Sequence, residues 1–360
     1  MMKAIQIWAG QPSHYENKEC LPENFSDVER FHLSMTVYKK TPLHCLSSLA
    51  STLNVKRIYV KDESSRFGLN AFKGLGVSYA MNKILENNQG ESFTFVSCTD
   101  GNHGKALAWM AHELGYPAII FMPKGSEPRR VRAIEKHHAK VIVTDMNYND
   151  TVCYAAAFSR DNQFCFVQDT ALTDYTQIPN DIIWGYSTMV REALEQMGEK
   201  PTHVFVQAGV GSLAGGVVWY LWNKYPDSLP FIGVIEAENV ACIYESVKQN
   251  RTVCIGGEPY TAMAGLNCGV ANPSVFPLLK AKVNYFIKCA DDITFKGLSR
   301  ARHPIGKDAS FSSGESGAVG LGFVEEVLSN PDYKDKKELL QLNPDSVILV
   351  FNTEGEIYDE

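Results

Sequence analysis

A glycine-rich segment in the second half of the chain is the first part of the sequence that could do chemistry. Residues 207–216 read QAGVGSLAGG and lie between an apolar run and a helical pattern. Glycines let backbone N–H groups converge on an anion, and the N-terminus of the following helix adds partial positive charge. We therefore expect a phosphate group to bind here. Tight packing of a strand against a helix, with no ligand, is the alternative.

A lysine among apolar neighbours is the second candidate. Lys73 lies within residues 61–76, KDESSRFGLNAFKGLG, where a helix is expected to begin, and Phe72, Leu75 and Val77 are its apolar neighbours. Apolar surroundings disfavour the charged amine, so they lower its pKa and make it nucleophilic, as Schiff-base chemistry requires. An ordinary solvated lysine is the alternative.

These two segments together favour pyridoxal phosphate (PLP) over a nicotinamide cofactor. Gly209, Gly211 and Ala214 satisfy the dinucleotide pattern G-x-G-x-x-G/A. Glu236 ends the next apolar run, where an acid that binds ribose belongs in a dinucleotide site. On the glycine segment alone, the two cofactors are nearly equal candidates. Lys73 would have no task in a nicotinamide enzyme, and this observation favours PLP.

Polar segments follow several other apolar runs. Residues 97–104 read SCTDGNHG, and their backbone N–H groups could hold a carboxylate. Asp169 is placed to point into a cleft, Thr353 could offer its hydroxyl to a ring nitrogen, and residues 313–317, SGESG, could line the same pocket. A turn or a helix cap is the alternative for each segment. The three arginines of residues 128–132, PRRVR, are expected on a solvated helix face.

Alternating strands and helices must position these segments. Apolar, β-rich runs are expected at residues 57–61, 93–98, 118–122, 141–144, 164–167, 203–207, 231–235 and 346–351. Helical patterns lie between them, with one long helix expected over residues 179–197. Strands in which Val, Ile and Phe follow one another, without polar residues in alternate positions, are typical of parallel sheets that helices cover on both faces. Ligands of such sheets lie outside the carboxyl ends of the strands, which is where the candidate segments fall.

Size and composition exclude several classes of protein. A chain of 360 residues predicts two domains. No apolar run is long enough to span a bilayer, and the first residues do not resemble a secretory signal. The net charge of −7 offers no basic face to nucleic acid or to an anionic membrane. The nine cysteines form no C-x-x-C pair, so we expect no metal site and predict reduced thiols in the cytoplasm.

Taken together and in order, the segments resemble the fold-type II PLP enzymes, the group of the tryptophan synthase β-subunit and threonine dehydratase. Within that group the chain most resembles the diaminopropionate ammonia-lyase family. The resemblance extends over residues 41–355. The motifs that carry it are KDESSRFGLNAFKGLG (61–76), TDGNHG (99–104), QDT (168–170), QAGVGSLAGG (207–216), EAENVAC (236–242), MAGLNCG (263–269), SGESGAV (313–319) and TEG (353–355).

The resemblance implies an α/β fold of two domains, each with a mostly parallel sheet covered by helices, and an active site in the cleft between them. Residues 1–75 and 188–360 would form the large, PLP-binding domain, and residues 76–187 the small domain. A homodimer is implied as well. Cys242 and Cys268 are expected near strand ends around the cleft, where a regulatory thiol pair is conceivable.

The resemblance also implies roles for single residues. Lys73, beside Phe72, would be the Schiff-base lysine, Asn102 would hydrogen-bond the phenolic oxygen of the cofactor, and Thr353 would face its pyridine nitrogen. The residues implied for the phosphate are Gly209, Val210, Gly211, Ser212 and Leu213. The residues implied for the substrate are Thr99, Asp100, Gly101, Asn102, His103 and Asp169.

The implied activity is α,β-elimination of ammonia from D- or L-2,3-diaminopropionate, giving pyruvate and ammonia, in amino-acid degradation. Lys73 would remove the Cα proton of one enantiomer and Asp100 that of the other, while Asp169 or Asp100 would protonate the leaving amine. Asp100 stands where other fold-type II enzymes tend to carry serine, and carboxylates suit a cationic β-ammonium group.

The sequence departs from the family pattern in places, so alternatives remain. Leu172, Thr173 and Asp174 replace the residues that usually follow Asp169, and Ala237 stands where many relatives have proline. A serine or threonine dehydratase of the same fold is one alternative. The other is a nicotinamide-binding or non-catalytic relative that uses the glycine segment alone.

Overall fold

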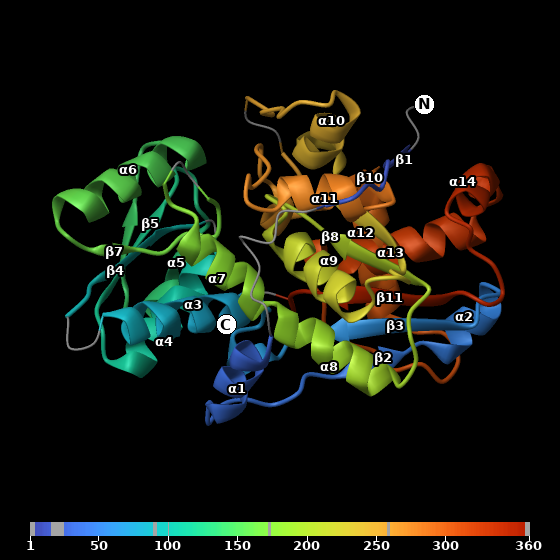
Figure 1. The fold of residues 1–360 in the computed structure, drawn as a ribbon, viewed down its shortest axis with the longest axis horizontal. Coiled ribbons are helices and arrows are strands. Elements are labelled where there is room, and N and C mark those ends of the chain that lie inside the picture. Colours follow the sequence, from blue (N-terminus) through green and yellow to red (C-terminus); the bar gives the residue numbers. More distant parts are fainter. Residues whose placement is uncertain are drawn as a thin grey trace.

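The structure is a computed structural model that describes residues 4–15, 25–88, 92–99, 101–171, 174–257 and 260–356. Three residues singled out in the sequence lie outside the described residues, namely Asp100, Leu172 and Thr173. The two sheets lie side by side in Figure 1, the smaller on the left with α3 to α7 and the larger on the right.

Seven strands form the larger sheet, in the order β1-β10-β9-β8-β11-β3-β2. All pairings among its five inner strands are parallel, and the two edge strands pair antiparallel to their neighbours. The strands are β1 (Ile5–Ala9), β2 (Leu43–Cys45), β3 (Arg57–Asp62), β8 (His203–Gln207), β9 (Phe231–Ala237), β10 (Tyr285–Cys289) and β11 (Val347–Asn352). The five parallel strands therefore lie in the interior of the sheet, and an antiparallel strand forms each of its two edges.

Four parallel strands form the smaller sheet, in the order β6-β5-β4-β7. They are β4 (Phe95–Cys98), β5 (Ala118–Met122), β6 (Lys140–Val143) and β7 (Cys165–Phe166). Parallel neighbours need a crossover connection, and helices provide it here, as the alternation in the sequence predicts.

Helices connect the strands and cover both sheets. They are α1 (Ser26–Ser34), α2 (Ser47–Thr52), α3 (Lys73–Asn87), α4 (Asn102–Leu114), α5 (Pro128–Glu135), α6 (Tyr148–Asp161), α7 (Gln177–Gly185), α8 (Ser187–Met197), α9 (Ser212–Lys224), α10 (Cys242–Lys248), α11 (Phe276–Lys282), α12 (Asp291–Arg302), α13 (Glu315–Ser329) and α14 (Lys334–Leu339). Short 3-10 helices are η1 (Arg66–Gly68), η2 (Glu238–Val240), η3 (Ala264–Leu266) and η4 (Pro331–Tyr333).

The inner strands of the larger sheet are apolar on both faces because each face meets a separate core. In β8, Val204 and Val206 belong to one apolar cluster and Phe205 to another. In β11, Leu349 and Val350 are divided in the same way. Successive side chains of a strand point to opposite faces, so a strand covered on both sides shows no polar alternation.

Two expected elements differ from the structure. The helix predicted over residues 179–197 is two helices, α7 and α8, which meet at Tyr186. Gly185, the last residue of α7, lies against the backbone of α3, since a Cβ there would be 2.4 Å from the carbonyl oxygen of Leu75. The strands β1, β2 and β10 were not predicted, because short runs such as YFIKC carry little signal of their own.

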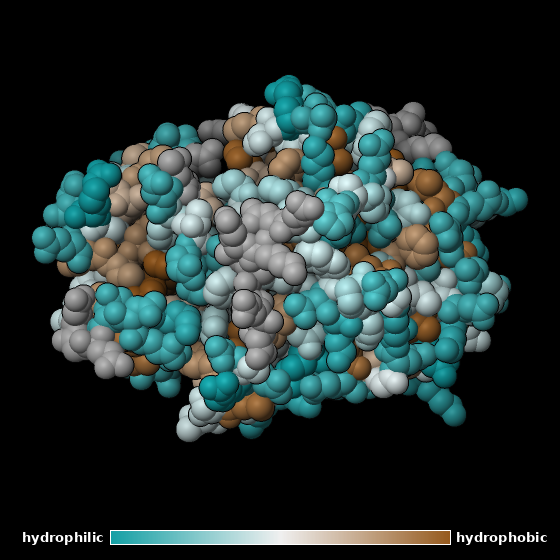
Figure 2. All heavy atoms as spheres, in the orientation of Figure 1, coloured by the Kyte–Doolittle hydropathy of each residue, from teal (hydrophilic) through white to brown (hydrophobic). Residues whose placement is uncertain are grey.

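The outer surface adds two observations. Hydrophilic residues predominate on the face drawn in Figure 2, where apolar residues appear in separate patches, as on most globular proteins. Within the described part of the chain, none of the helices combines the length and the apolar character that crossing a bilayer requires.

Candidate active site

A cavity of about 630 Å³ collects the predicted site residues from the carboxyl ends of four strands. The segments that follow β4 and β7 come from the smaller sheet, and those that follow β8 and β11 come from the larger one. Its walls include Phe72, Lys73, Thr99, Gly101, Asn102, His103, Asp169, Gly209, Val210, Gly211, Ser212, Leu213 and Thr353. Asp100 lies outside the described residues, so its side chain is not part of this description.

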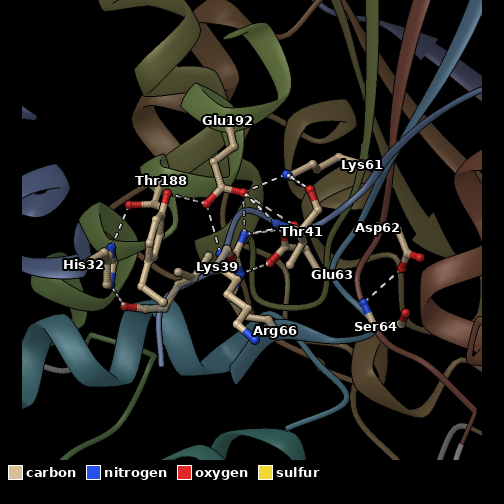
Figure 3. A network of polar contacts seen from close by, with 12 residues as sticks. His32, Lys39, Thr41, Lys61, Asp62, Glu63, Ser64, Arg66, Thr188 and Glu192 are labelled. Carbon is tan, nitrogen blue, oxygen red and sulfur yellow. Dashed lines mark hydrogen bonds and ion pairs between the residues drawn. The ribbon is translucent and has the colours of Figure 1, made fainter. Parts of the chain in front are cut away.

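A buried ionic network holds the segment that leads to Lys73 (Figure 3). Its four charged side chains, Lys61, Glu63, Arg66 and Glu192, are all fully buried. Lys61 donates to Glu192 at 2.7 Å, and Arg66 donates to Glu192 at 2.8 and 3.0 Å and to Glu63 at 2.7 and 2.8 Å. Burial alone would raise the pKa of Glu192, but Arg66 and Lys61 lower it to about 2. Two cations and two carboxylates therefore fix β3 and η1 against α8.

A neutral histidine extends this network to the first turn of α3. His32 lies fully buried, with Nδ1 2.7 Å from the hydroxyl of Thr188 and Nε2 3.1 Å from the carbonyl oxygen of Leu75 (Figure 3). Burial and the nearby Arg66 lower the pKa of His32 to about 3. The side chain is therefore uncharged near neutral pH and connects α1, α3 and α8 by hydrogen bonds alone.

Lys73 opens α3 and forms an ion pair across the cavity. Its Nζ donates to Oδ2 of Asp169 at 2.5 Å, and Nζ lies 5.3 Å from the ring centroid of Phe72. The apolar neighbours in the sequence predicted a lowered pKa, and this prediction is wrong for the structure described. Burial does lower the pKa of Lys73, but the carboxylate of Asp169 outweighs it and raises the pKa above its usual value. The partner that decides the charge lies 96 residues later in the chain.

Asp169 is ionised in this arrangement, and its neighbour His103 is neutral. Burial alone would raise the pKa of Asp169, but the ammonium group of Lys73 lowers it to about 2. Burial lowers the pKa of His103, whose Nε2 lies 3.1 Å from the carbonyl oxygen of Val167. Because a carbonyl only accepts, Nε2 carries the proton and Nδ1 presents a lone pair. Nδ1 has no hydrogen-bond partner within the described residues and lies 3.9 Å from Oδ2 of Asp169.

The glycine-rich segment after β8 presents unpaired amides to the cavity. None of the backbone N–H groups from Gly209 to Leu213 donates a hydrogen bond to another residue that the structure describes. They precede or begin α9, whose N-terminus carries partial positive charge. Gly211 has φ +99°, which strains any residue with a Cβ, and a Cβ on Gly209 would lie 3.0 Å from the sulfur of Cys268. The local backbone is thus built to surround an anion closely.

Asn272, which the sequence did not single out, holds this segment against Asp169. Its Nδ2 donates to the hydroxyl of Ser212 at 2.9 Å and to the backbone oxygen of Asp169 at 3.3 Å. The hydroxyl of Ser212 in turn donates to the same backbone oxygen at 2.7 Å. Ser212 therefore uses its hydroxyl for structure and offers its backbone N–H to a ligand. An asparagine in a loop gives no sign in the sequence of so distant a contact.

The hydroxyl of Thr353 is oriented by Gln207 at the end of β8. Nε2 of Gln207 donates to this hydroxyl at 3.0 Å, and also to the backbone oxygens of Ser316 and Phe351. Since the oxygen of Thr353 accepts from Gln207, its proton is available to a second group. No hydrogen bond donated by this hydroxyl to another described residue is present, and Thr353 lines the cavity.

Glu354 is a second residue that the sequence did not reveal. Its carboxylate accepts from Nδ2 of Asn102 at 2.7 Å and from the backbone N–H of Ser316 at 3.1 Å, and it lines the cavity. Burial raises the pKa of Glu354. The residue follows Thr353 directly, so the motif that contains it was visible in the sequence, but its contact with Asn102 was not.

Three further predictions concern residues around this cavity: Thr99, the segment 313–317, and the pair Cys242 and Cys268. The hydroxyl of Thr99 accepts hydrogen bonds from the backbone N–H groups of Gly101 at 2.9 Å and Gly104 at 3.2 Å. These bonds hold the start of α4 in place. In the segment 313–317, Gly314, Glu315 and Ser316 line the cavity. The thiol of Cys242 lies 3.9 Å from the backbone oxygen of Gly209, so Cys242 and Cys268 both flank that glycine.

Glu236 does not serve the dinucleotide alternative. Both of its carboxylate oxygens accept backbone N–H groups at the start of α10, from Ile243 at 2.8 Å and Tyr244 at 2.7 Å. Burial raises the pKa of Glu236 to about 8. The side chain is enclosed and does not line the cavity, so it is not placed to bind a ribose there.

The arginines of α5 are not merely a solvated helix face, as the sequence suggested. Arg129, Arg130 and Arg132 line the cavity, because α5 lies beside the start of α4. Lys105 of α4 lines it too, and burial, with a smaller contribution from Arg130, lowers the pKa of Lys105.

Comparisons with known proteins agree with this geometry. A family model described as "Pyridoxal-phosphate dependent enzyme" matches residues 35–343. A diaminopropionate ammonia-lyase of Escherichia coli (strain K12) is 45% identical over 349 residues, which cover 91% of this chain and 87% of that protein. A diaminopropionate ammonia-lyase of Salmonella typhimurium (strain LT2) is 40% identical over 358 residues, which cover 92% and 88%.

A solved structure shows the same similarity in three dimensions. It is the crystal structure of diaminopropionate ammonia lyase from Escherichia coli in complex with an aminoacrylate-PLP azomethine reaction intermediate. The TM-score is 0.92 at 41% sequence identity, and the match covers 98% of this chain and 94% of that one.

Proposed function

The chain belongs to the pyridoxal-phosphate-dependent enzymes and, within them, to the diaminopropionate ammonia-lyases, and from this premise we propose its activity. The enzyme is a carbon–nitrogen lyase of fold type II that eliminates ammonia from 2,3-diaminopropionate, giving pyruvate and ammonia, with PLP as cofactor. The structural observation that carries the proposal is the placement of a lysine amine, an anion-binding turn and acidic side chains in one cavity.

The residues of the cavity fit PLP on the chemistry of their donors. The unpaired amides from Gly209 to Leu213 suit a phosphate dianion, which accepts several hydrogen bonds at a helix N-terminus. The available proton of Thr353 suits a ring nitrogen that carries none. The amine of Lys73 suits the aldehyde, and Asn102, whose amide has a second N–H, suits the phenolic oxygen. Phe72 would pack beside the bound ring.

When bound, PLP supplies an electron sink that stabilises negative charge on the Cα atom of the substrate. Thr353 as the partner of the ring nitrogen keeps that nitrogen unprotonated, because a hydroxyl is far too weak an acid to protonate it. This electron sink is therefore weaker than in an enzyme where a carboxylate pairs with the ring nitrogen. The protein's own acid and base groups must then contribute more to proton transfer.

Proton transfer between Lys73 and Asp169 is the central step that we assign to the chain. Lys73 must be uncharged to bond to an aldehyde, and the hydrogen bond to Asp169 gives its proton a direct route. Asp169, protonated in this way, can then give the proton to a β-amine that is bound uncharged, whereas a β-ammonium group leaves as ammonia without a further proton. The freed amine of Lys73 would remove the Cα proton of one enantiomer, and Asp100 would remove that of the other.

The charge of the site matches the substrate. The β-ammonium group of 2,3-diaminopropionate is cationic, so carboxylates near it contribute binding energy as well as acid and base groups. Asp169 and Glu354 provide such carboxylates among the described residues. A hydroxy-amino acid such as serine or threonine carries no cation there and would gain nothing from them.

A product assay tests this activity. We expect pyruvate and ammonia from at least one enantiomer of 2,3-diaminopropionate, and much slower release of keto acid from serine or threonine. Asp100→Asn should reduce turnover of the D-enantiomer more than that of the L-enantiomer. Faster reaction with serine or threonine would instead assign the chain to the dehydratases of the same fold.

Covalent mapping tests the role of Lys73. Borohydride reduction of the cofactor-loaded protein should leave a pyridoxyl group on the peptide that contains Lys73. Lys73→Ala should abolish the visible absorption band and lower kcat by about 10²- to 10⁴-fold or more. Lys83→Ala is the matched control, since Lys83 lies on the same helix and pairs with Glu86 at the surface. A pyridoxyl label on another residue would refute the assignment.

Three coarser features complete the proposal. The two sheets support a division into a large domain of residues 1–75 and 188–360 and a small domain of residues 76–187, with the site in the cleft between them. The family resemblance supports a homodimer, which light scattering of the purified protein would test. The lack of any predicted disulfide framework among nine cysteines supports a cytoplasmic enzyme, and the substrate class supports a role in amino-acid degradation.

A further inference from the structure

Tyr186 lies behind Lys73, outside the wall of the cavity. It is fully buried at the junction of α7 and α8, and it does not line the cavity. Its ring centroid lies 4.8 Å from that of Phe72 and 6.0 Å from Nζ of Lys73. Two aromatic rings therefore flank the amine, Phe72 in the wall of the cavity and Tyr186 outside it.

Close packing fixes the position of this tyrosine. A Cβ on Gly76 would lie 2.6 Å from the Tyr186 ring, and a Cβ on Gly216 would lie 3.3 Å from its Cβ. Residues without side chains on α3 and α9 thus make room for it. A large ring enclosed between two helices in this way has little freedom to swing elsewhere.

The hydroxyl of Tyr186 has no hydrogen-bond partner among the residues that the structure describes. Burying a hydroxyl without a partner costs free energy, and phenylalanine would fill the same space without that cost. Burial raises the pKa of the phenol to about 12, and the ammonium group of Lys73, which acts on the phenol oxygen, opposes this rise without cancelling it. The phenol is therefore protonated and has a hydrogen to donate.

Lys73 needs such a donor only after it loses its charge. As an ammonium ion it donates to Asp169. Once Asp169 has taken the proton, the ion pair no longer exists, and the uncharged amine presents a lone pair that accepts a hydrogen bond. The nearby phenol is a donor that neither the ion pair nor the cavity wall uses.

We propose that Tyr186 is a positioning residue for Lys73, and that its hydroxyl donates a hydrogen bond to Nζ whenever the amine is uncharged and released from Asp169. This inference rests on the proposed function for its consequence in catalysis, but the hydrogen bond itself belongs to the chain. It holds the free amine at the cavity edge and favours its uncharged form.

The test is Tyr186→Phe, read first in the cofactor-free protein. Acetic anhydride at mildly alkaline pH acetylates uncharged amines, and peptide mapping reports the rate at Lys73 against the exposed lysines of the same digest. Losing a hydrogen bond that favours the uncharged amine should lower that rate about tenfold, which corresponds to a pKa about one unit higher. A purely structural role would loosen the site and raise the rate instead.

Kinetics of the cofactor-loaded enzyme give the second measurement. We measure kcat as a function of pH with the enantiomer whose Cα proton Lys73 removes. In Tyr186→Phe, the rise of kcat on the acid side should move upward by about one pH unit, and KM should change less than about twofold. Tyr79→Phe is the matched control, because Tyr79 is another buried tyrosine, on the helix that begins with Lys73. It should leave both measurements unchanged.

Each result bears on one conclusion. Acetylation of Lys73 that is unchanged or faster in Tyr186→Phe overturns the inference, and so does a loss of thermal stability, which would show that the hydroxyl has a partner in the resting fold. Failure of the wild-type enzyme to release pyruvate from 2,3-diaminopropionate would refute the proposed function while leaving the acetylation result intact.

Discussion

The carboxylate of Glu354 joins the beginnings of two helices that belong to different sheets. It accepts from Asn102 at the start of α4 and from the backbone N–H of Ser316 in the first turn of α13. The amide of Asn102 has one N–H for Glu354 and one left for a ligand. Glu354 thus sets the direction in which Asn102 faces the cavity, a role that its position after Thr353 alone does not reveal.

Glu354→Gln tests this role at the scale of one residue. The new amide keeps only one acceptor oxygen for two donors, so either Asn102 or the backbone N–H of Ser316 would face an N–H₂ group, and the orientation of Asn102 would no longer be fixed. Since hydrogen bonds to charged groups contribute about 1.5–3 kcal/mol, we expect PLP to bind about tenfold more weakly or worse. Equilibrium dialysis of PLP measures this, and Glu315→Gln, which removes the same charge from the same cavity wall, should change the affinity less than about twofold. Equal losses in both variants would show that only the net charge matters.

At the scale of elements, α8 carries one fully buried carboxylate and one exposed carboxylate. Glu192 lies inside the network with Lys61 and Arg66, whereas Glu195, one turn later on the same helix, pairs with Lys40 at the surface. Breaking a buried ion pair leaves an uncompensated charge without water, while an exposed pair is replaced by water at little cost. The network also supports η1 and the turn that leads into α3, so it reaches Lys73 indirectly.

Glu192→Ala should therefore destabilise the protein by about 3–5 kcal/mol, because two buried cations lose their shared carboxylate. Glu195→Ala on the same helix should cost only about 0.2–1 kcal/mol. Urea denaturation of both variants measures the difference in free energy of unfolding. A small effect of Glu192→Ala would mean that Glu63 and water compensate the two cations.

At the scale of the whole molecule, two separate sheets are joined by polar contacts at the cavity and by one apolar cluster to which strands of both sheets contribute. Asp169 and Asn102 follow strands of the smaller sheet, and their partners Ser212 and Glu354 follow strands of the larger one. The ligand site is thus also a place where the two halves are joined. Protonation of the Asp169 carboxylate, whose pKa is lowered in the folded chain, should weaken the molecule as a whole.

Acid should unfold the cofactor-free protein partly through Asp169. A carboxyl whose pKa is lower in the folded chain stabilises it above the unfolded value and loses that contribution as the pH falls. For Asp169 the loss runs from near 3.8 to about 2, and it amounts to about 2 kcal/mol. At neutral pH, Asp169→Asn should unfold at a lower urea concentration than the wild type. Below about pH 4, the ordinary range of carboxyl titration, its free energy of unfolding should decline less steeply. Asp27→Asn, an exposed residue paired with exposed Arg30, should keep the wild-type slope, and a wild-type slope in Asp169→Asn would contradict the assignment.

The sequence by itself determined the parallel α/β architecture, and it identified the glycine-rich turn at 207–216 and Lys73 as candidates, because each pattern depends on neighbouring residues. Apolar runs, glycines before a helix and an amine beside Phe72 act over a few positions, so their pattern is readable along the chain. The family, the cofactor and the fold class are confirmed by the comparisons. Roles of individual residues remain predictions for experiment.

Only the tertiary structure decided the charge of Lys73, the partner of Asn102 and the use of Glu236. Lys73 meets Asp169 from 96 residues away, Asn102 meets Glu354 from 252 residues away, and Glu236 is enclosed by α10. Charge and hydrogen bonding depend on distance in space and on the exclusion of water, and packing sets both. A pattern along the chain therefore identifies which groups can react, while the folded chain fixes which of them carries the proton.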